Sequence, residues 1–429
     1  MNKKILIAGA LLSANLAQAT DFEVSGYVGF EWREHFEEGQ FNTDDSEQAD
    51  RQIGLTAEPE MVWSLADGEH TIVFKPYARI DSEDDERTHG DIRELSWMTY
   101  GDDWELTTGL SRVYWGVAES QHLVDIVNQT DFVEAPDGED KLGQPMIKLS
   151  LIRDWGTVDS FILPGFRERT FPGEEGRFRF PAEILTGDAR YQANEEEEHI
   201  DFAFRWSHTI EDYDIGLSYF NGTSREPIFL TDGYPEVADG IFTGEFILTS
   251  FTPVYLQIQQ FGLDVQATLD SWLWKLEAIH RELDDYSYDI TRPSGTVTST
   301  VEQKDFTAAT GGFEYTFYGP FETIWDWGVL AEYQYDSRED GSIAIGQNDF
   351  FVGSRIAFND VASSEVLAGI SQDLDSSDTR TLFVEFATRL NEGLKLNVDV
   401  FLPMTGDDEN LSYQFKQDEY VQLSLNYYY

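Results

Sequence analysis

The last ten residues of the chain read Tyr420-Val421-Gln422-Leu423-Ser424-Leu425-Asn426-Tyr427-Tyr428-Tyr429. Side chains of a β-strand alternate between its two faces. One face here is apolar, with Val421, Leu423, Leu425, Tyr427 and Tyr429. The other face carries Gln422, Ser424, Asn426 and Tyr428. An apolar-out, polar-in strand is typical of a transmembrane β-barrel, and at the C-terminus it would pair with the first strand to close the barrel.

The same alternation recurs upstream. It is clearest in 199–210, 324–337 and 394–405, and tryptophans gather at strand ends, as at Trp63, Trp272 and Trp325. Aromatic rings prefer the boundary between membrane and water. A soluble β-sandwich or β-solenoid would also alternate, but it would not normally combine aromatic strand ends with the regular alternation of connections described next.

Short turns rich in Gly, Asn and Asp alternate along the chain with long acidic connections. Outer-membrane barrels have this asymmetry, with short periplasmic turns and longer external loops. The fold class we predict is therefore an all-β, transmembrane, antiparallel up-and-down barrel. Sixteen strands is the alternative to eighteen, because 91–100 and 157–167 alternate poorly. The 18 predicted strands are 22–36, 51–66, 70–81, 91–100, 104–114, 145–153, 157–167, 199–210, 213–222, 253–269, 272–285, 305–318, 324–337, 349–358, 364–375, 379–390, 394–405 and 418–429.

The N-terminus has the features of a secretory signal. Lys3 and Lys4 precede a mostly apolar stretch, and Ala17-Gln18-Ala19 is a small-x-small cleavage site. We expect a signal peptide at 1–19 and one barrel domain at 20–429. The apolar stretch is too short for a membrane anchor, which needs about 20 apolar residues.

Composition excludes several classes of function. The formal net charge of −52 argues against nucleic-acid binding. The chain has no cysteine, so disulfides and thiol-based metal or catalytic sites are impossible. The seven histidines show no Ser–His or metal-ligand spacing, and no phosphate loop or nucleophile elbow occurs. We therefore expect no enzyme, and a barrel-embedded hydrolase is the less favoured alternative.

The C-terminal strand resembles the assembly signal of Gram-negative outer-membrane proteins, which usually ends in Phe where this chain ends in Tyr429. The whole pattern resembles a general porin. Trp115-Gly116-Val117-Ala118-Glu119-Ser120 is also similar to uncharacterised proteobacterial barrel families with a Trp-Gly element after an early strand. The resemblance implies the outer membrane, contact with lipid and lipopolysaccharide, insertion by the barrel assembly machinery and a homotrimer. It also implies a passive channel for small hydrophilic solutes. A scaffold or adhesin barrel without an open pore is the alternative.

Charged residues of both signs fall on the inward faces of the strands, so water must fill the lumen or the charges must pair across it. The connection 115–144 is partly apolar, and in general porins the loop in this position folds into the lumen. We expect it to narrow the channel with Glu119, Asp125 and Asp131 opposite a basic ladder of Arg33, Lys75, Arg79, Arg93 and Arg112. Alternatively, these groups only brace the wall. Because acids dominate the mouth, we expect a mild preference for cations.

Two further features are open to a functional interpretation. In 168–198 and just before it, Arg167, Arg169, Arg177 and Arg179 alternate with phenylalanines, which suits an anionic or sugar-like solute but also ordinary packing. Acidic clusters recur at Asp44-Asp45, Glu83 to Glu86, Glu195 to Glu198, Asp284-Asp285 and Asp407 to Glu409. Ca²⁺ or Mg²⁺ could bridge them, but none has the spacing of a dedicated calcium loop. A solvated acidic rim is therefore favoured.

Overall fold

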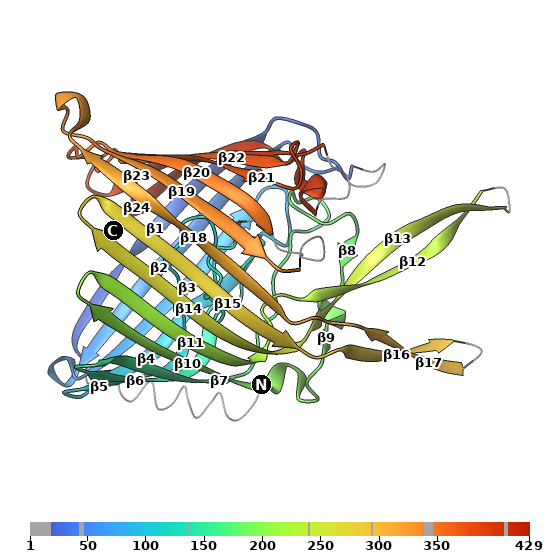
Figure 1. Ribbon diagram of the computed structural model, residues 1–429, viewed down its shortest axis with the longest axis horizontal. Coiled ribbons are helices and arrows are strands. Elements are labelled where there is room, and N and C mark those ends of the chain that lie inside the picture. Colours follow the sequence, from blue (N-terminus) through green and yellow to red (C-terminus); the bar gives the residue numbers. More distant parts are fainter. Residues whose placement is uncertain are drawn as a thin grey trace.

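A computed structural model describes residues 19–42, 47–135, 137–238, 241–292, 295–338, 346–406 and 411–429. Residues 1–18 of the expected signal peptide and the acidic clusters at 44–45 and 407–409 lie outside these residues. Eighteen strands form one antiparallel sheet (Figure 1). They are β1 (Ala19–His35), β2 (Arg51–Leu65), β3 (His70–Asp81), β4 (Gly90–Tyr100), β5 (Trp104–Ser111), β6 (Gln144–Arg153), β7 (Gly156–Pro164), β10 (Ile200–Ile210), β11 (Tyr213–Thr223), β14 (Gln257–Leu269), β15 (Trp272–Leu283), β18 (Phe306–Tyr318), β19 (Asp326–Asp336), β20 (Asn348–Ala357), β21 (Glu365–Asp373), β22 (Arg380–Arg389), β23 (Leu394–Met404) and β24 (Tyr420–Tyr428).

The sheet closes on itself. Each strand pairs with the next in this series, and the last strand, β24, pairs with β1 from Tyr27 opposite Tyr428 to His35 opposite Tyr420. Closure leaves no free sheet edge, which a membrane-spanning sheet requires. The prediction of an 18-stranded antiparallel barrel is confirmed, and the 16-strand alternative is wrong.

The two predicted strands that alternate poorly, 91–100 and 157–167, correspond to β4 and β7, and a different physical cause disrupts the alternation in each. In β4 the register shifts where Lys75 faces Glu94 but Pro76 faces Ile92, so Arg93 is an extra residue in a bulge. In β7 the inward residues Phe161 and Leu163 are apolar because they are buried inside the barrel. An apolar inner face removes the polar half of the alternation.

The outer surface of the barrel is apolar. Large hydrophobic side chains are exposed along alternate positions of successive strands, as expected for a wall in contact with lipid. No helix among the described residues is long and apolar enough to cross a membrane. The exposed residues include Phe22, Val28, Phe30, Ile53, Leu55, Phe202, Phe204, Trp272, Trp274, Phe350 and Val352.

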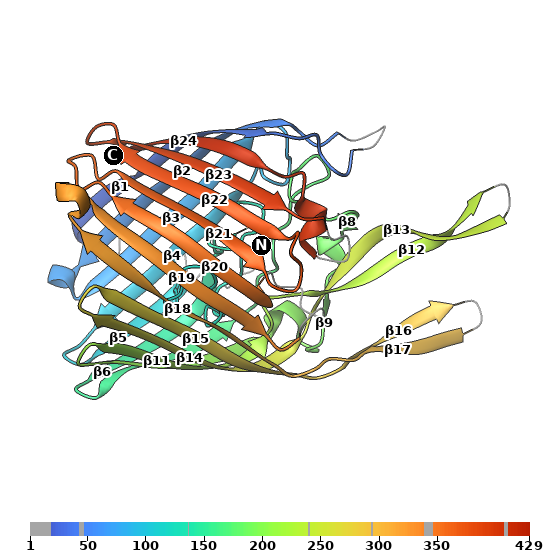
Figure 2. The same ribbon diagram turned by 45° about the horizontal axis from the view of Figure 1, so that its top comes forward.

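Connections differ between the two ends of the barrel. The C-terminus lies at the end with the short turns, whereas the long connections lie at the opposite end (Figures 1 and 2). Short elements interrupt both kinds of connection. They are the 3-10 helices η1 (Ala66–Gly68), η2 (Thr186–Asp188), η3 (Glu196–Glu198), η4 (Pro320–Glu322) and η6 (Leu411–Phe415), and the strands β8 (Glu183–Ile184) and β9 (Arg190–Tyr191).

Two predicted loops are β-hairpins that extend beyond the barrel (Figures 1 and 2). Within 223–252 lie β12 (Ile228–Ala238) and most of β13 (Ile241–Tyr255), and within 286–304 lie β16 (Tyr286–Arg292) and β17 (Gly295–Val301). The predicted strand 253–269 is therefore divided, since its first residues belong to β13. Apolar residues at the bases of the hairpins pack together and stabilise both of them: Val254, Leu256, Tyr286, Ile228, Leu230 and Tyr288.

The main hydrophobic cluster lies inside the barrel. It joins the connection between β5 and β6, residues 112–143, to the inner faces of β6, β7, β10, β11, β14, β15 and β18. We call this connection the inner loop. Val124 and Val127 of the inner loop are completely buried, and Trp115 lies edge-on to Phe161 at 5.7 Å. One side of the lumen is therefore filled by protein.

Candidate functional site: the lumen beside the inner loop

The tip of the inner loop is anchored to β15 by a buried glutamate. Glu277 accepts the backbone N–H groups of Val117 and Ala118 on Oε1, at 2.7 and 2.9 Å, and that of Val124 on Oε2 at 3.2 Å. Its side chain is inaccessible to solvent. A carboxylate that accepts several N–H groups satisfies backbone donors that would otherwise be buried without partners. The carboxylate thereby fixes the conformation of the tip.

A second glutamate anchors the next residues to β19. Glu332 accepts the backbone N–H of Glu119 at 2.9 Å and both the N–H and the hydroxyl of Ser120, at 2.8 and 2.6 Å. The Glu119 side chain in turn pairs with Lys275 at 3.2 Å and with Arg355 at 2.6 Å. Burial alone would raise the pKa of Glu119, but the charges of Arg355 and Lys275 lower it. Glu119 is therefore ionised and tied to the wall.

His122 adds a positive charge to this anchor. Its Nε2 lies 2.9 Å from Glu139, and its Nδ1 lies 4.0 Å from Glu277. Burial lowers the pKa of His122, but hydrogen bonds to the two glutamates outweigh it and raise the pKa to about 10. The imidazolium therefore balances part of the buried charge of Glu277 at neutral pH.

Asp125 and Asp131 lie inside the protein rather than on a surface that faces open water. Asp125 is buried and pairs with Lys141 at 3.4 Å. Burial raises the pKa of Asp125 although Lys141 opposes this effect. Asp131 is completely buried, with Arg93 at 2.5 Å and the Thr170 hydroxyl, which donates to it, at 2.6 Å. Their role at a constriction stays a prediction.

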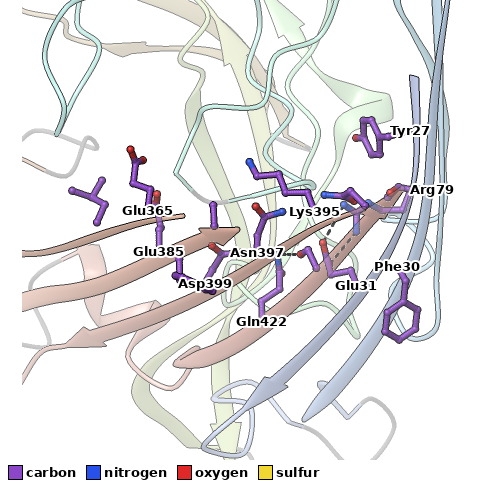
Figure 3. Close-up of a pocket in the computed structure, with 16 residues that line it drawn as sticks. Tyr27, Phe30, Glu31, Arg79, Glu365, Glu385, Lys395, Asn397, Asp399 and Gln422 are labelled. Atoms are coloured by element: carbon purple, nitrogen blue, oxygen red, sulfur yellow. Dashed lines mark hydrogen bonds and ion pairs between the residues drawn. The ribbon is translucent and has the colours of Figure 1, made fainter. Parts of the chain in front are cut away.

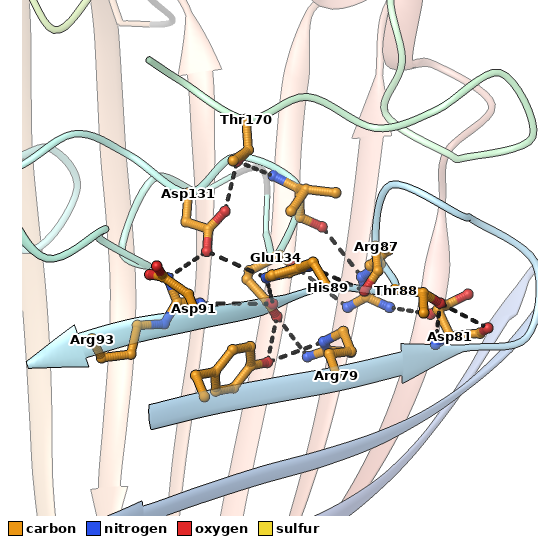
Figure 4. Close-up of polar contacts among 12 residues, drawn as sticks. Arg79, Asp81, Arg87, Thr88, His89, Asp91, Arg93, Asp131, Glu134 and Thr170 are labelled. Atoms are coloured by element: carbon orange, nitrogen blue, oxygen red, sulfur yellow. Dashed lines mark hydrogen bonds and ion pairs between the residues drawn. The ribbon is translucent and has the colours of Figure 1, made fainter. Parts of the chain in front are cut away.

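Asp131 belongs to a network of ion pairs between the inner loop and the β3–β4 region (Figure 4). Glu134 pairs with Arg79 at 2.7 Å, and its Oε1 lies 3.2 Å from Nε2 of His89. Burial opposes ionisation of Glu134, but His89 and Arg79 lower its pKa to about 2. The structure thus brings Arg79 and Arg93 of the expected basic ladder into direct contact with loop acids.

His89, Asp131 and Glu134 have the spacing of a metal site, with ligand atoms within 4.8 Å of one another. However, Arg93 and Arg79 already contact the two carboxylates at 2.5 and 2.7 Å. A divalent cation would lie against two guanidinium groups, which is electrostatically unfavourable. We therefore assign this cluster to ion pairing.

The other members of the basic ladder contact the wall. Arg33 donates to Gln422 at 2.8 Å, and its guanidinium lies 4.6 Å from the centre of the Tyr420 ring. Lys75 pairs with Glu60. Arg112 lies 4.0 Å from Glu58. None of these four contacts involves an acid of the inner loop.

Polar residues line an open cavity on the other side of the lumen (Figure 3). Its volume is about 440 Å³. Glu385 and Asp399 are direct neighbours across β22 and β23, and within the described part of the chain neither forms an ion pair. The lining residues come mainly from β1 and β21–β24. The polar ones are Tyr27, Glu31, Thr56, Arg79, Glu365, Glu385, Lys395, Asn397, Asp399, Gln422, Ser424 and Asn426, and the apolar ones are Phe30, Leu367, Phe386 and Ala387.

Two acids of the inner loop, Asp137 and Asp140, were not among the predicted site residues. Asp137 lies close enough to Glu385 and Asp399 to act on both through its charge. Desolvation inside the barrel and the negative charges of Glu134 and Asp137 raise the pKa of Asp140 to about 7. The run Asp137-Gly138-Glu139-Asp140 was the available sequence signal, but acids are so abundant in this chain that the run did not stand out.

The four arginines around 168–198 contact the protein itself. Arg167 pairs with Asp91 at 2.8 Å, and Arg169 donates to the carbonyl of Arg225 at 3.0 Å. Their alternating phenylalanines pack against other rings, including Phe171 against Phe229 at 5.9 Å. Two arginines bond to carbonyls of the β1–β2 connection: Arg177 to Glu37 and Arg179 to Phe41. Solute binding by this set stays a prediction.

Comparison with known proteins gives structural matches alone. No family model and no curated protein matches the chain. A triple mutant of the Rhodopseudomonas blastica porin is 12% identical with a TM-score of 0.41, covering 95% of this chain and 100% of that one. OmpT, an outer membrane protein of Vibrio cholerae in its trimer form, is 8% identical with a TM-score of 0.44, covering 95% and 99%. By its own strand pairing, the chain has the closed 18-stranded architecture of porin-type barrels.

Proposed function

We propose that this protein is an outer-membrane porin, a passive diffusion channel for small hydrophilic solutes with a mild preference for cations. The observation that carries the proposal is the polar cavity along β1–β3 and β21–β24, in a barrel of 18 strands. A barrel of this strand number is wide enough for an aqueous channel. The inner loop narrows this channel, and the protein is not an enzyme.

The charges beside the cavity support cation preference. Glu385 and Asp399 line it, Asp137 of the inner loop acts on both of them through its charge, and Asp140 lies close enough to Asp137 to interact with it. Arg79 and Lys395 also line it, but Arg79 is already paired with Glu31 and Glu134. Fixed negative charge raises the local concentration of cations. The charge of Glu119 is paired with Lys275 and Arg355, so this side chain mainly holds the inner loop to the wall.

Reversal potentials under a KCl gradient test the selectivity. The wild-type protein should favour K⁺, and Glu385→Gln or Asp399→Asn should each reduce that preference. Glu34→Gln is a matched control, because Glu34 pairs with Arg51 away from the cavity. Strong anion preference of the wild-type protein would refute the selectivity.

The same measurement should depend on pH. Since the pKa of Asp140 is about 7, this group is mostly neutral at pH 6 and mostly ionised at pH 8. Cation preference should therefore increase from pH 6 to pH 8. Asp140→Asn should weaken this dependence, and an unchanged dependence in that variant would exclude Asp140 from the conducting path.

The wider setting is part of the same proposal. We infer the outer membrane of a Gram-negative bacterium, insertion by the barrel assembly machinery, contact with lipopolysaccharide and a homotrimer. The two projecting hairpins, β12–β13 and β16–β17, favour a second candidate, a scaffold or adhesin barrel without an open pore. Ion conductance across a lipid bilayer supports the channel, whereas a folded and inserted barrel without conductance supports the scaffold or adhesin.

A further inference from the structure

The connection between β7 and β10, residues 165–199, begins far from where its tip is bound. Six strands, β1 to β6, lie between β7 and β24 in the closed sheet. We call residues 165–180 the strap. Its contacts run from β7, over the inner loop, to the ends of β1 and β24, so it crosses the mouth of the barrel at the end with the long connections.

The first part of the strap lies on the inner loop. The Thr170 hydroxyl donates to Asp131 at 2.6 Å and accepts the backbone N–H of Val133 at 3.2 Å. Gln129 donates to the carbonyl of Arg167 at 3.3 Å. The strap and the inner loop are therefore two successive layers within the barrel mouth.

The middle of the strap is bound to two other connections at this end. The backbone N–H of Gly173 donates to Asp84 in the β3–β4 connection at 3.1 Å. In the β1–β2 connection, the Gln48 amide donates to the carbonyl of Gly176 at 2.9 Å, and the backbone N–H of Ala49 donates to Glu175 at 3.3 Å. These bonds hold the strap to the part of the rim above β1–β4.

The far end of the strap is held by Phe178, in addition to the bonds of Arg177 and Arg179 to the β1–β2 connection. Phe178 is 3% exposed, and its backbone N–H donates to Asp418 at 3.0 Å. The centre of its ring lies 5.7 to 6.3 Å from those of four others, from β1, β23, β24 and the connection before β24. They are His35, Phe401, Phe415 and Tyr420.

The backbone of Phe178 shows that the tip is held in place. Its φ of +60° is in the left-handed region, which is unfavourable for a residue other than glycine. Such a conformation persists only where the surrounding contacts outweigh it. The four rings around Phe178 and the carboxylate of Asp418 supply those contacts.

From these contacts we propose that the strap forms a second, outer constriction that limits which solutes enter, and that Phe178 is the positioning residue that keeps it across the mouth. This inference rests on the proposed channel function and adds a size limit at the mouth to it. Solutes then meet the strap first and the inner loop second.

The test compares Phe178→Ala with the wild-type protein in liposomes. We expect swelling with neutral sugars of increasing size to show that the variant admits larger sugars and has a several-fold higher rate for the largest. Phe351→Ala is the control, because Phe351 is as deeply buried on β20 and packs with Leu330 and Leu367, in a cluster that contains no residue of the strap or the inner loop. Migration in unheated gels checks that both variants fold.

A reversible cross-link completes the test. Ala49→Cys with Glu175→Cys joins two residues already bonded through their backbones, in a chain without other cysteines. Oxidation of this pair should restore the wild-type size limit to Phe178→Ala, and reduction should remove it again.

Each outcome is decisive. A folded Phe178→Ala variant with the wild-type size limit would overturn the strap proposal while the channel function stands. If the wild-type protein admits no sugar and the variant does, the strap closes the mouth and the proposal is supported. If neither admits any sugar, both the strap proposal and the channel function fail.

Discussion

At the scale of single residues, buried carboxylates determine where the inner loop lies. Glu277 and Glu332 belong to the wall, yet their acceptors are occupied by backbone N–H groups of residues more than 150 positions away in the chain. Hydrogen bonds to charged acceptors contribute about 1.5–3 kcal/mol each. A few such bonds are enough to fix a loop tip of this size.

Glu277→Ala should loosen the inner loop, because three backbone N–H groups lose their acceptor. Each unsatisfied buried donor costs about 1–3 kcal/mol. We expect faster proteolysis within 112–143 and a lower urea midpoint of unfolding. Glu60→Ala is the control, since it removes a partly exposed ion pair with Lys75, which contributes about 0–1 kcal/mol. Equal effects of the two substitutions would contradict the anchor.

The sequence did not reveal these anchors. Alternation indicates that Glu277 and Glu332 face inward, but it does not indicate whether they meet water, an arginine or a backbone N–H. The expected constriction acids Asp125 and Asp131 are buried because bases that alternation does not identify as their partners, Lys141 of the same loop and Arg93 of β4, neutralise them. Sequence periodicity predicts the face of a residue and not its partner.

At the scale of elements, all 18 wall strands were predictable, because each has a lipid face with a period of two. The exceptions follow the same rule. The bulge at Arg93 and the apolar inner face of β7 disrupt alternation without ending the strand. The hairpins β12–β13 and β16–β17 were missed because long connections of a barrel were expected to be irregular, although Tyr286 and Tyr288 already alternate.

Two substitutions in the closing strand, β24, test which of its side chains face the lipid and which face the lumen. Leu423→Arg should impair folding, because an arginine on the lipid face near the membrane centre costs about 2–4 kcal/mol. Ser424→Arg, one residue further, should be tolerated since Ser424 lines the lumen cavity. The yield of folded protein in unheated gels measures both. Equal yields would contradict the assigned faces.

At the scale of the whole molecule, the barrel is filled unevenly. One side of the lumen holds the hydrophobic cluster around the inner loop, and the other holds the polar cavity. The net charge of −52 and the inward-facing charges indicate an aqueous interior. They do not indicate that protein fills one side of it and leaves a cavity on the other. That division arises from tertiary packing of one partly apolar connection against apolar wall residues such as Phe161, Phe220 and Ile279.

The most direct test of the central claim, a water-filled path through the barrel, is the current across a planar lipid bilayer after addition of the purified protein. The account predicts discrete, ohmic conductance steps in KCl, with cations carrying the larger share. A correctly folded protein that inserts into the bilayer and gives no conductance step at any voltage would contradict it.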